Sequence, residues 1–452
     1  MAEPALRTAA RPRPAPLALL AQHPLRAIVS LAAPTTAVML MAAVSNVLHT
    51  YFVSRLGDDA IAAVSLVFPI ALIMMTVIAG GLGAGVSSGI ARALGAGRVA
   101  DACGVAEHAV LIISVLAVLG TLATELGGRA LFAAMGGQGV VLDQATTFAR
   151  VLFGGLLITF TVSAFDSILR GTGNVRVPAL CATLSLALQI VLTPVLLFHL
   201  GLGLSGAPLA TLTGQLIGLM PRLVYVYGGR AHFRPRIVPR RLHAGHAREI
   251  LRVGVPASLS AALNYIALVI LTGTIARFGT EHLAAYGLGT RLDFLLFTLG
   301  FGVAAATLTL VAMATGAGRP DLISRYVIQS CALVAAVIAV PALLVVWRPS
   351  LWLGIFTAAP DITAIGAAYF HVVGLSYVFV VISMVVATAF QGLGRATVPM
   401  TVMVARVVLV VSGALFAARG FGAGAETIFA IIATGNVVAC VVLVALFRAV
   451  VR

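Results

Sequence analysis

The most regular feature of the chain is a series of long apolar runs separated by short polar or glycine-rich turns. About twelve runs reach the roughly 20 residues that a helix needs to cross a bilayer. They cover approximately residues 28–53, 60–84, 104–123, 147–168, 178–199, 207–227, 254–276, 283–312, 327–347, 366–390, 398–416 and 428–447. This pattern predicts an all-α membrane protein with about 12 transmembrane helices.

The second half of the chain repeats the first. The strings ending in Pro34 and Pro256 begin two similar apolar runs, and RLGDDAIAA at 55–63 returns as RFGTEHLAA at 277–285. ALGAGR at 93–98 and LRGTGNVRVP at 169–178 return at 314–319 and 390–399. Four anchors in one order predict a tandem duplication. Six spans per copy, an even number, predict two parallel six-helix repeats with a cavity between them.

The repeats divide the chain into four parts: a tail (1–24), an N-lobe (25–227), a linker (228–249) and a C-lobe (250–452). The tail is rich in arginine and proline, and the linker is the longest basic segment between apolar runs. Within the N-lobe, the glycines of 80–85 are not followed by Lys-Ser/Thr, so they do not form a phosphate loop. We expect them to let helices approach closely, or alternatively to act as a hinge.

Composition excludes an ordinary soluble protein, because 61% of residues are hydrophobic, 10% are charged and the mean hydropathy is +1.10. The net charge is +15, and every basic residue apart from histidine is arginine. Twenty arginines fall on the side of the amino terminus and five on the other side. The positive-inside rule therefore places both termini in the cytoplasm, and the charge indicates topology rather than nucleic-acid binding. Four scattered cysteines, without CxxC spacing, indicate neither a metal site nor a disulfide framework.

Ionisable residues at membrane depth are costly, so each is a functional candidate. His49 lies about 10 Å inside the first run, and is either a core histidine or a proton-titrating group. Asp293 and Arg406 lie at similar depth in the C-lobe, where they form either a structural ion pair or a coupling site. Asp166 lies one turn before Arg170, which favours an interfacial i,i+4 pair but leaves a coupling role open.

Uncharged polar and aromatic residues supply candidates for the substrate cavity. Gln189, Gln215, Asn264 and Asn436 are expected to hold helices together or to contact a ligand. Tyr265 belongs to a set of aromatic residues that can line an apolar cavity able to accept cations. That set also contains Phe160, Tyr286, Phe294, Phe297 and Tyr377.

The strings LAAP and NVLHTYFVSRLGDDAIAAVS, followed by ARALGAGR and LRGTGNVRVP, resemble the multidrug and toxic compound extrusion (MATE) family over residues 25–447. The resemblance implies a cation-coupled exporter with two six-helix lobes around a central cavity, working by alternating access. It also implies amphipathic, often cationic substrates exchanged against H+ or Na+.

This chain departs from the family pattern at two positions. His49, three residues after Asn46, stands where many members carry an Asp that serves as cation site. Many members also carry an N-x-x-x-D-P string in the fifth helix. In this chain Gln189 stands at the position of its Asn and Thr193 at the position of its Asp, and the proline is kept. Because a hard cation needs oxygen ligands and negative charge, protons are expected as the coupling ion rather than Na+. No other cofactor is expected.

These observations predict a monomeric, multi-pass exporter of small organic molecules in the inner membrane, in contact with lipid and without nucleic acid. Its candidate coupling residues are His49, Asp293 and Asp166, and its candidate cavity residues are Asn46, Gln189, Thr193, Asn264, Tyr265 and Arg406. One alternative is a flippase for lipid-linked precursors with the same fold. A membrane-embedded enzyme is the other, but the sequence has no HxxxH, HExxH or dense acidic cluster.

Overall fold

A computed structural model describes residues 23–451, apart from 229, 232, 237–242 and 421–423. The predicted tail therefore lies almost entirely outside the described residues. The first half of the chain consists of α2 (Pro24–Ser54), α3 (Asp58–Met75), the π-helix η1 (Thr76–Leu82), α4 (Gly83–Gly95), α5 (Val99–Ala134), α6 (Gly139–Gly154), α7 (Leu156–Gly171), α8 (Arg176–Pro194), η2 (Val195–His199), η3 (Gly203–Ser205) and α9 (Gly206–Tyr227).

The second half has the same character, and no strand occurs among the described residues of either half. It consists of α10 (Ala244–Ile275), η4 (Ala276–Phe278), α11 (Thr280–Gly316), α12 (Pro320–Trp347), α13 (Ser350–Leu353), α14 (Pro360–Val373), η5 (Gly374–Ser376), α15 (Tyr377–Gly392), α16 (Thr397–Gly420) and α17 (Ala425–Val451).

The predicted number of membrane spans agrees with the structure. Among the described residues, eleven helices are long and apolar enough to cross a membrane, and α6 with α7, bent by 44°, makes up to a twelfth. Large apolar side chains also lie exposed on the helices, as expected for a surface that contacts lipid. Leu126, Leu180 and Val269 are each 70% exposed or more. The chain is a multi-pass membrane protein.

Turns at corresponding positions of the two repeats have the same backbone conformation. Gly57 and Gly279 precede α3 and α11 with φ of 108° and 117°, values that glycine adopts readily. Gly97 and Gly318 pair in the same way (74° and 66°), as do Gly173 and Gly394 (81° and 75°). Pro178 and Pro399 are each the third residue of their helix, α8 and α16. The repeated motifs therefore form equivalent helix ends.

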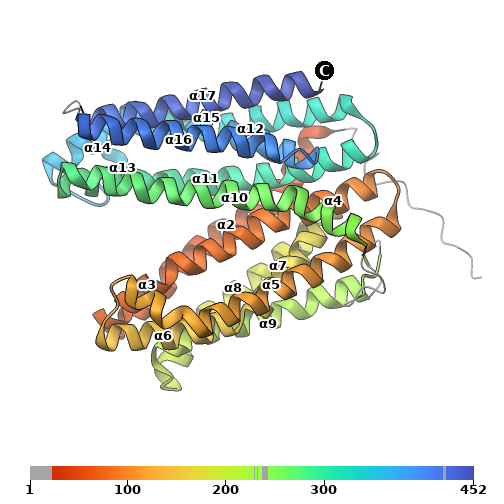
Figure 1. The fold of residues 1–452 in the computed structure, drawn as a ribbon, viewed down its shortest axis with the longest axis horizontal. Helices are drawn as coiled ribbons and strands as arrows, with labels where there is room; N and C mark the ends of the chain where they lie inside the picture. Colours follow the sequence, from red (N-terminus) through yellow and green to blue (C-terminus); the bar gives the residue numbers. More distant parts are fainter. Residues whose placement is uncertain (1–22, 229, 232, 237–242, 421–423, 452) are drawn as a thin grey trace, which may run out of the picture.

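The two halves form separate bundles that meet at one end of the molecule and diverge toward the other (Figure 1). We call the end where they meet the Arg-rich end, because its helix ends and turns carry Arg92, Arg98, Arg319 and Arg395. Each half has its own hydrophobic core. The first turns of α2 are an exception, since Ala27, Ile28 and Leu31 are buried in the core of the second half. This part of α2 therefore joins the two halves.

Helix α10 begins earlier than the sequence predicts. The seventh apolar run was expected from 254 and the linker until 249, but α10 already begins at Ala244. The apolar pattern does not detect these residues because the helix extends beyond membrane depth with the polar sequence AGHARE. The polar start of α10 packs against α5 of the first half instead of facing lipid.

Glycines allow the halves to approach closely near the Arg-rich end. A Cβ atom on Gly81 or Gly85 would overlap Ser258 or the Ile250 carbonyl of α10. The Ser258 hydroxyl donates a hydrogen bond of 2.9 Å to the carbonyl of Val77 in the π-helix. These contacts confirm the predicted packing role of the glycine-rich stretch. Since the same stretch overlaps a π-helix, the hinge alternative stays a prediction.

Candidate functional site

The carboxylate of Asp293 lies in the middle of α11, in the interior of the second half. Tyr369 of α14 donates a hydrogen bond of 2.8 Å from its hydroxyl to Asp293 Oδ2. Gly289, one turn earlier on the same face of α11, makes this possible, because a Cβ there would lie 2.3 Å from the Tyr369 ring. The small residue thus lets the ring lie against α11 and reach the carboxylate.

The other oxygen of this carboxylate lies in the neighbourhood of the Tyr377 hydroxyl. Asp293 Oδ1 is buried and has no hydrogen bond within 3.5 Å among the described residues, and the buried hydroxyl of Tyr377 interacts with this carboxylate from a longer distance. Tyr286 completes an aromatic wall, since its ring contacts that of Tyr369 edge-on at 5.8 Å. A buried polar atom without a partner is costly, so Oδ1 marks a position where a proton or a cationic group can bind.

Arg406 of α16 does not form the predicted ion pair with Asp293. Its Nε donates to Asn436 Oδ1 at 3.1 Å, and its Nη1 donates to Asn264 Oδ1 at 3.3 Å. Asn436 in turn donates to the Ser376 hydroxyl at 2.9 Å. The ion-pair expectation is wrong because sequence depth places two charges at one level of the membrane but not on facing helix surfaces.

These residues form one group, which we call the second-half polar cluster. It consists of Tyr286, Asp293, Tyr369, Tyr377, Asn264, Arg406, Asn436 and Ser376. Tyr286 lies within electrostatic range of both charged members. Sequence analysis missed Tyr369 and Ser376, which come from α14 and η5. The available signal for Tyr369 was Gly289 one turn before Asp293, but a glycine in a helix does not reveal which ring fills the space.

The candidate residues of the first half are not gathered in this way. His49 is half-buried near the end of α2 and has no hydrogen bond or ion pair among the described residues. The Thr193 hydroxyl donates to the Gln189 carbonyl on its own helix at 2.6 Å. Asn46 is exposed, and no side-chain hydrogen bond connects it with His49 among the described residues. Tyr265, next to Asn264 in the second half, has no polar contact within the described chain.

Asp166 forms a different ion pair from the one that the sequence predicts. Arg222 of α9, only 1% exposed, donates from Nε to Asp166 Oδ1 at 2.6 Å and from Nη2 to Oδ2 at 3.3 Å. Arg170, the predicted partner, contacts the Ser167 hydroxyl instead. The i,i+4 pairing is wrong because α7 and α9 pack together and bring the buried guanidinium to the carboxylate. This bidentate pair neutralises the charge of Asp166.

A set of hydrogen bonds joins the halves at the Arg-rich end. Arg92 of α4 forms an ion pair with Glu249 of α10 at 2.8 Å. Its Nη1 also donates to the carbonyls of Gln391 (3.1 Å) and Gly392 (2.8 Å) at the end of α15. Within the second half, Arg252 of α10 donates to the Gly394 carbonyl at 2.8 Å. A basic group at a helix C-terminus is favourable, and the contacts of Arg92 hold the two halves together.

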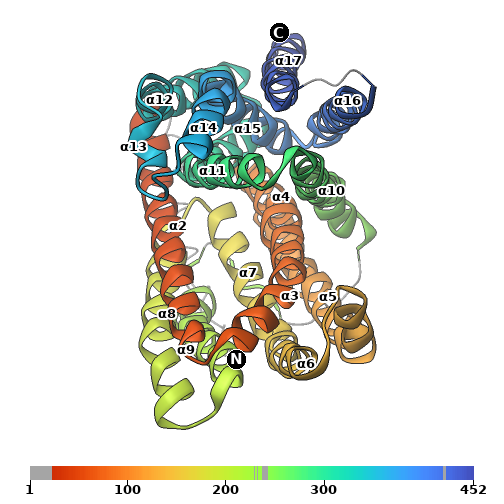
Figure 2. The ribbon, with the colours of Figure 1, turned by 90° about the vertical axis from the view of Figure 1, so that its left-hand side faces the viewer.

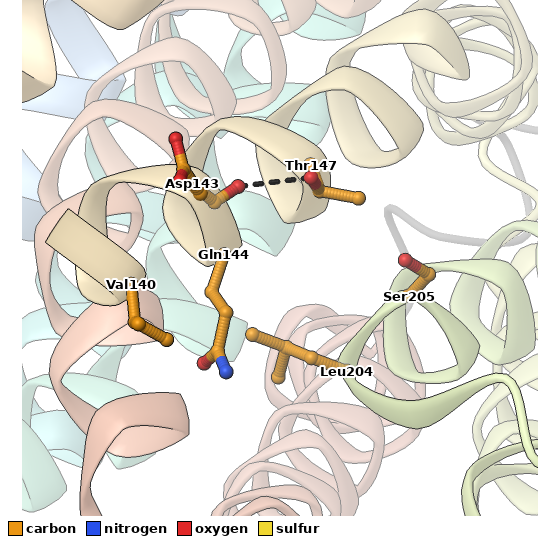
Figure 3. Close-up of a pocket in the computed structure, with 6 residues that line it drawn as sticks. All are labelled: Val140, Asp143, Gln144, Thr147, Leu204 and Ser205. Carbon is orange, nitrogen blue, oxygen red and sulfur yellow. Dashed lines mark hydrogen bonds between the residues drawn. The ribbon is translucent and has the colours of Figure 1, made fainter.

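One surface depression lies away from all these groups. It has a volume of about 310 Å³ and lies between α6 and η3 (Figure 3). Its carboxylate, Asp143, forms an exposed ion pair with Arg129 at 2.7 Å. Thr147 donates to the Asp143 carbonyl within α6. Because its charges are already paired and exposed, we do not place the functional site there.

The described residues contain no group of three His, Cys, Asp or Glu side chains able to hold a metal ion. The four cysteines are free. The chemistry available at membrane depth is therefore that of single titratable groups, hydrogen-bonding amides and aromatic rings.

Comparison with known proteins points to one family. The sequence profile of the MatE family matches this chain twice, over residues 34–195 and 256–416. The two matched segments begin 222 residues apart, as the internal repeat does. The profile thus corresponds to one repeat, and the chain contains two.

The relatives of this chain are transporters. An FAD transporter of Shewanella oneidensis is 29% identical over 281 residues, which span 60% of this chain and 61% of that protein. A probable multidrug resistance protein, NorM, of Thermotoga maritima is 25% identical over 83% of this chain and 81% of its own length.

Solved structures of transporters have the same fold. A MOP superfamily transporter from Pyrococcus furiosus superposes with a TM-score of 0.88 at 26% identity, covering 96% of this chain and 97% of that one. A MATE transporter in a bent conformation has a TM-score of 0.87 at 27% identity, with the same coverage.

Proposed function

This chain belongs to the MatE family, and on that premise we propose that it exports small amphipathic organic compounds in exchange for protons. The observation that carries the proposal is the buried carboxylate of Asp293 in the second half, with Oδ2 bonded to Tyr369 and Oδ1 without a hydrogen bond within 3.5 Å. A proton or the basic group of a substrate can occupy this position, but not both. Such competition is the differential affinity that exchange requires.

Asp293 is favoured over Asp166 as the exchange site, because Arg222 already neutralises Asp166. A carboxylate held by a buried bidentate arginine exchanges protons poorly, since releasing the pair would leave the guanidinium buried and uncompensated. His49 is proposed as a second titratable group. It lacks a fixed partner among the described residues, and its protonated ring would repel a cationic substrate.

Protons are proposed as the coupling ion rather than Na+. A sodium ion needs several oxygen ligands and negative charge, and no group of three His, Cys, Asp or Glu side chains occurs among the described residues. Asp293 offers one free carboxylate oxygen with a tyrosine hydroxyl nearby. One free oxygen is sufficient for a proton.

Alternating access would use the relative movement of the two halves. Their contacts concentrate near the Arg-rich end, where Arg92 and Glu249 form an ion pair between α4 and α10. Opening this end while the other closes would expose the polar cluster to each side in turn. We further propose an inner-membrane location, cytoplasmic termini on the Arg-rich side and a monomer that contacts lipid. Small-molecule substrates and no further cofactor complete the proposal.

The test is efflux of a cationic dye from proteoliposomes under a pH gradient or a Na+ gradient imposed separately. We expect the pH gradient alone to drive efflux. Asp293→Asn should abolish that response, because an amide cannot exchange a proton. The control variant is Asp321→Asn, which removes a carboxylate from an exposed ion pair with Arg319. Efflux driven by Na+ alone, or unchanged pH-driven efflux in Asp293→Asn, would refute the proposal.

A further inference from the structure

Arg406 keeps a positive charge at membrane depth without an acidic partner among the described residues. Its hydrogen bonds go to amide oxygens of Asn436 and Asn264 and to the sulfur of Met403. The carboxylate at comparable depth, Asp293, binds Tyr369 instead. Neutral acceptors satisfy the hydrogen bonds of a guanidinium but leave its charge uncompensated.

Three other deep arginines of the chain have a carboxylate near them, and one of them, Arg170, lies within electrostatic range of Asp166 without bonding to it. Arg222 has the carboxylate of Asp166 at 2.6 Å, and Arg92 has that of Glu249 at 2.8 Å. A charge removed from water without a counter-ion costs several kcal/mol, so a fold has reason to pair it. The exception at Arg406 therefore points to a counter-ion that the protein itself does not supply.

Arg406 is half-buried at membrane depth, beside an exposed amide. Arg406 is nine residues from the start of α16, about 14 Å along the helix axis and thus near the middle of a bilayer. Its partner Asn264, on α10, is exposed, and α10 and α16 lie side by side (Figure 2). An amide and a charged group at this depth face a wet space rather than hydrocarbon.

The edge of the guanidinium formed by Nη1 and Nη2 is available for an acid. The Nη1 contacts are long, at 3.3 Å to Asn264 and 3.7 Å to Met403. On the other side, Asn436 holds both Nε and Nη2 and is itself fixed by Ser376. Gly435 lets α16 and α17 approach closely there, because a Cβ would lie 2.4 Å from Val410. The cluster thus orients the guanidinium and leaves one edge for a planar, bidentate acceptor.

We propose that Arg406 binds an acidic group of the substrate, a carboxylate or a phosphate, within the second-half polar cluster. This inference rests on the proposed function and narrows its substrate class. The preferred compounds carry a basic group, which competes with the proton at Asp293, and an acidic group, which binds Arg406. Tyr286 lies within electrostatic range of both charges.

The experiment compares rhodamine B, which has a free carboxylate, with its cationic ethyl ester. Binding of each dye to the purified protein in detergent is measured by fluorescence anisotropy. Because a charge-assisted bidentate contact is lost on esterification, we expect the acid to bind at least about tenfold more tightly. Arg406→Gln should remove this preference by weakening binding of the acid alone. Arg98→Gln, at an exposed surface pair with Asp101, is the control.

A second variant keeps Arg406 and tests whether the lack of a counter-ion from the protein causes the preference for the acid. Asn436→Asp conserves shape but gives Arg406 a counter-ion from the protein, so it too should remove the preference for the acid. This variant decides the matter if Arg406→Gln does not fold. Equal binding of acid and ester by the wild-type protein, or failure to bind the acid, overturns the inference. So does a preference that survives in Asn436→Asp.

Two further comparisons complete the experiment. The first distinguishes a substrate acid from a lipid phosphate at Arg406, and the second distinguishes failure of this inference from failure of the proposed function. In nanodiscs, the preference should be the same with phosphatidylcholine and with added phosphatidylglycerol. Loss of the preference with phosphatidylglycerol would assign Arg406 to a lipid phosphate and overturn the inference. Efflux of the ester depends on Asp293 and not on Arg406. If the wild-type protein shows pH-driven efflux of the ester but no preference for the acid, this inference alone is refuted. If the wild-type protein prefers the acid but shows no pH-driven efflux of the ester, the proposed function alone is refuted.

Discussion

Charged residues at membrane depth have different partners in the two halves of this protein. Asp166 and Arg222 neutralise each other in a buried bidentate pair, which leaves no free oxygen for exchange. Asp293 and Arg406, in contrast, are each bound by neutral groups and keep an unsatisfied capacity for a ligand. Hence the same residue types stabilise the first half and form the candidate site of the second.

The pair in the first half gives a stability prediction. Asp166→Asn should lower the free energy of unfolding by about 3–5 kcal/mol, because the buried Arg222 would lose its counter-ion. The double variant Asp166→Asn with Arg222→Met should lose less, since no uncompensated charge remains. Chemical denaturation in detergent micelles measures both. A double variant less stable than the single one would contradict this account.

His49 gives a prediction of pH dependence. Histidine titrates between about pH 5 and 8, and a protonated ring near the path of a cationic substrate slows its passage. We expect His49→Gln to keep dye efflux but to flatten its dependence on external pH between about 5.5 and 8. His49→Asp should retain a pH dependence, because a carboxylate also titrates. An unaltered profile in a well-folded His49→Gln protein would make this residue an ordinary core histidine.

At the scale of helices and turns, the sequence predicts much of the structure because its signals are local. Apolar length identifies the spans, and the paired glycines of the repeated motifs identify equivalent turns. Partners are not local. Asp166 bonds to a residue 56 positions away and Asp293 to one 76 positions away. Depth along a helix indicates the level of a charge in the membrane, but not the helix that it faces.

The contacts of Arg92 give a prediction about the movement of these helices. This residue joins α4 to α10 and to the end of α15. Replacing it by alanine should favour opening of the Arg-rich end, because the ion pair and two carbonyl contacts are lost. Distances between spin labels at this end should broaden toward longer values in Arg92→Ala. The distances between the labels should not change in Arg98→Ala, because the Arg98 side chain is largely exposed. Unchanged distances in Arg92→Ala would refute the role of this contact.

On the scale of the whole molecule, two similar repeats have become chemically different. Both copies keep the turns and the helix ends, while the free carboxylate and the unpaired guanidinium lie in the second copy. In the proposed mechanism, the duplicated scaffold supplies the movement and one half supplies the binding chemistry. The central claim of this account is that substrate and proton compete for Asp293.

Proton release on binding tests that claim most directly. The cationic dye ester is added to purified protein in weakly buffered solution with a pH indicator, at a pH where the site holds its proton. We predict that the wild-type protein releases about one proton for each dye bound, because both occupy one carboxylate oxygen. Asp293→Asn should release none, and Asp321→Asn should behave as wild type. Dye binding without proton release by the wild-type protein, or equal release by Asp293→Asn, would contradict the claim.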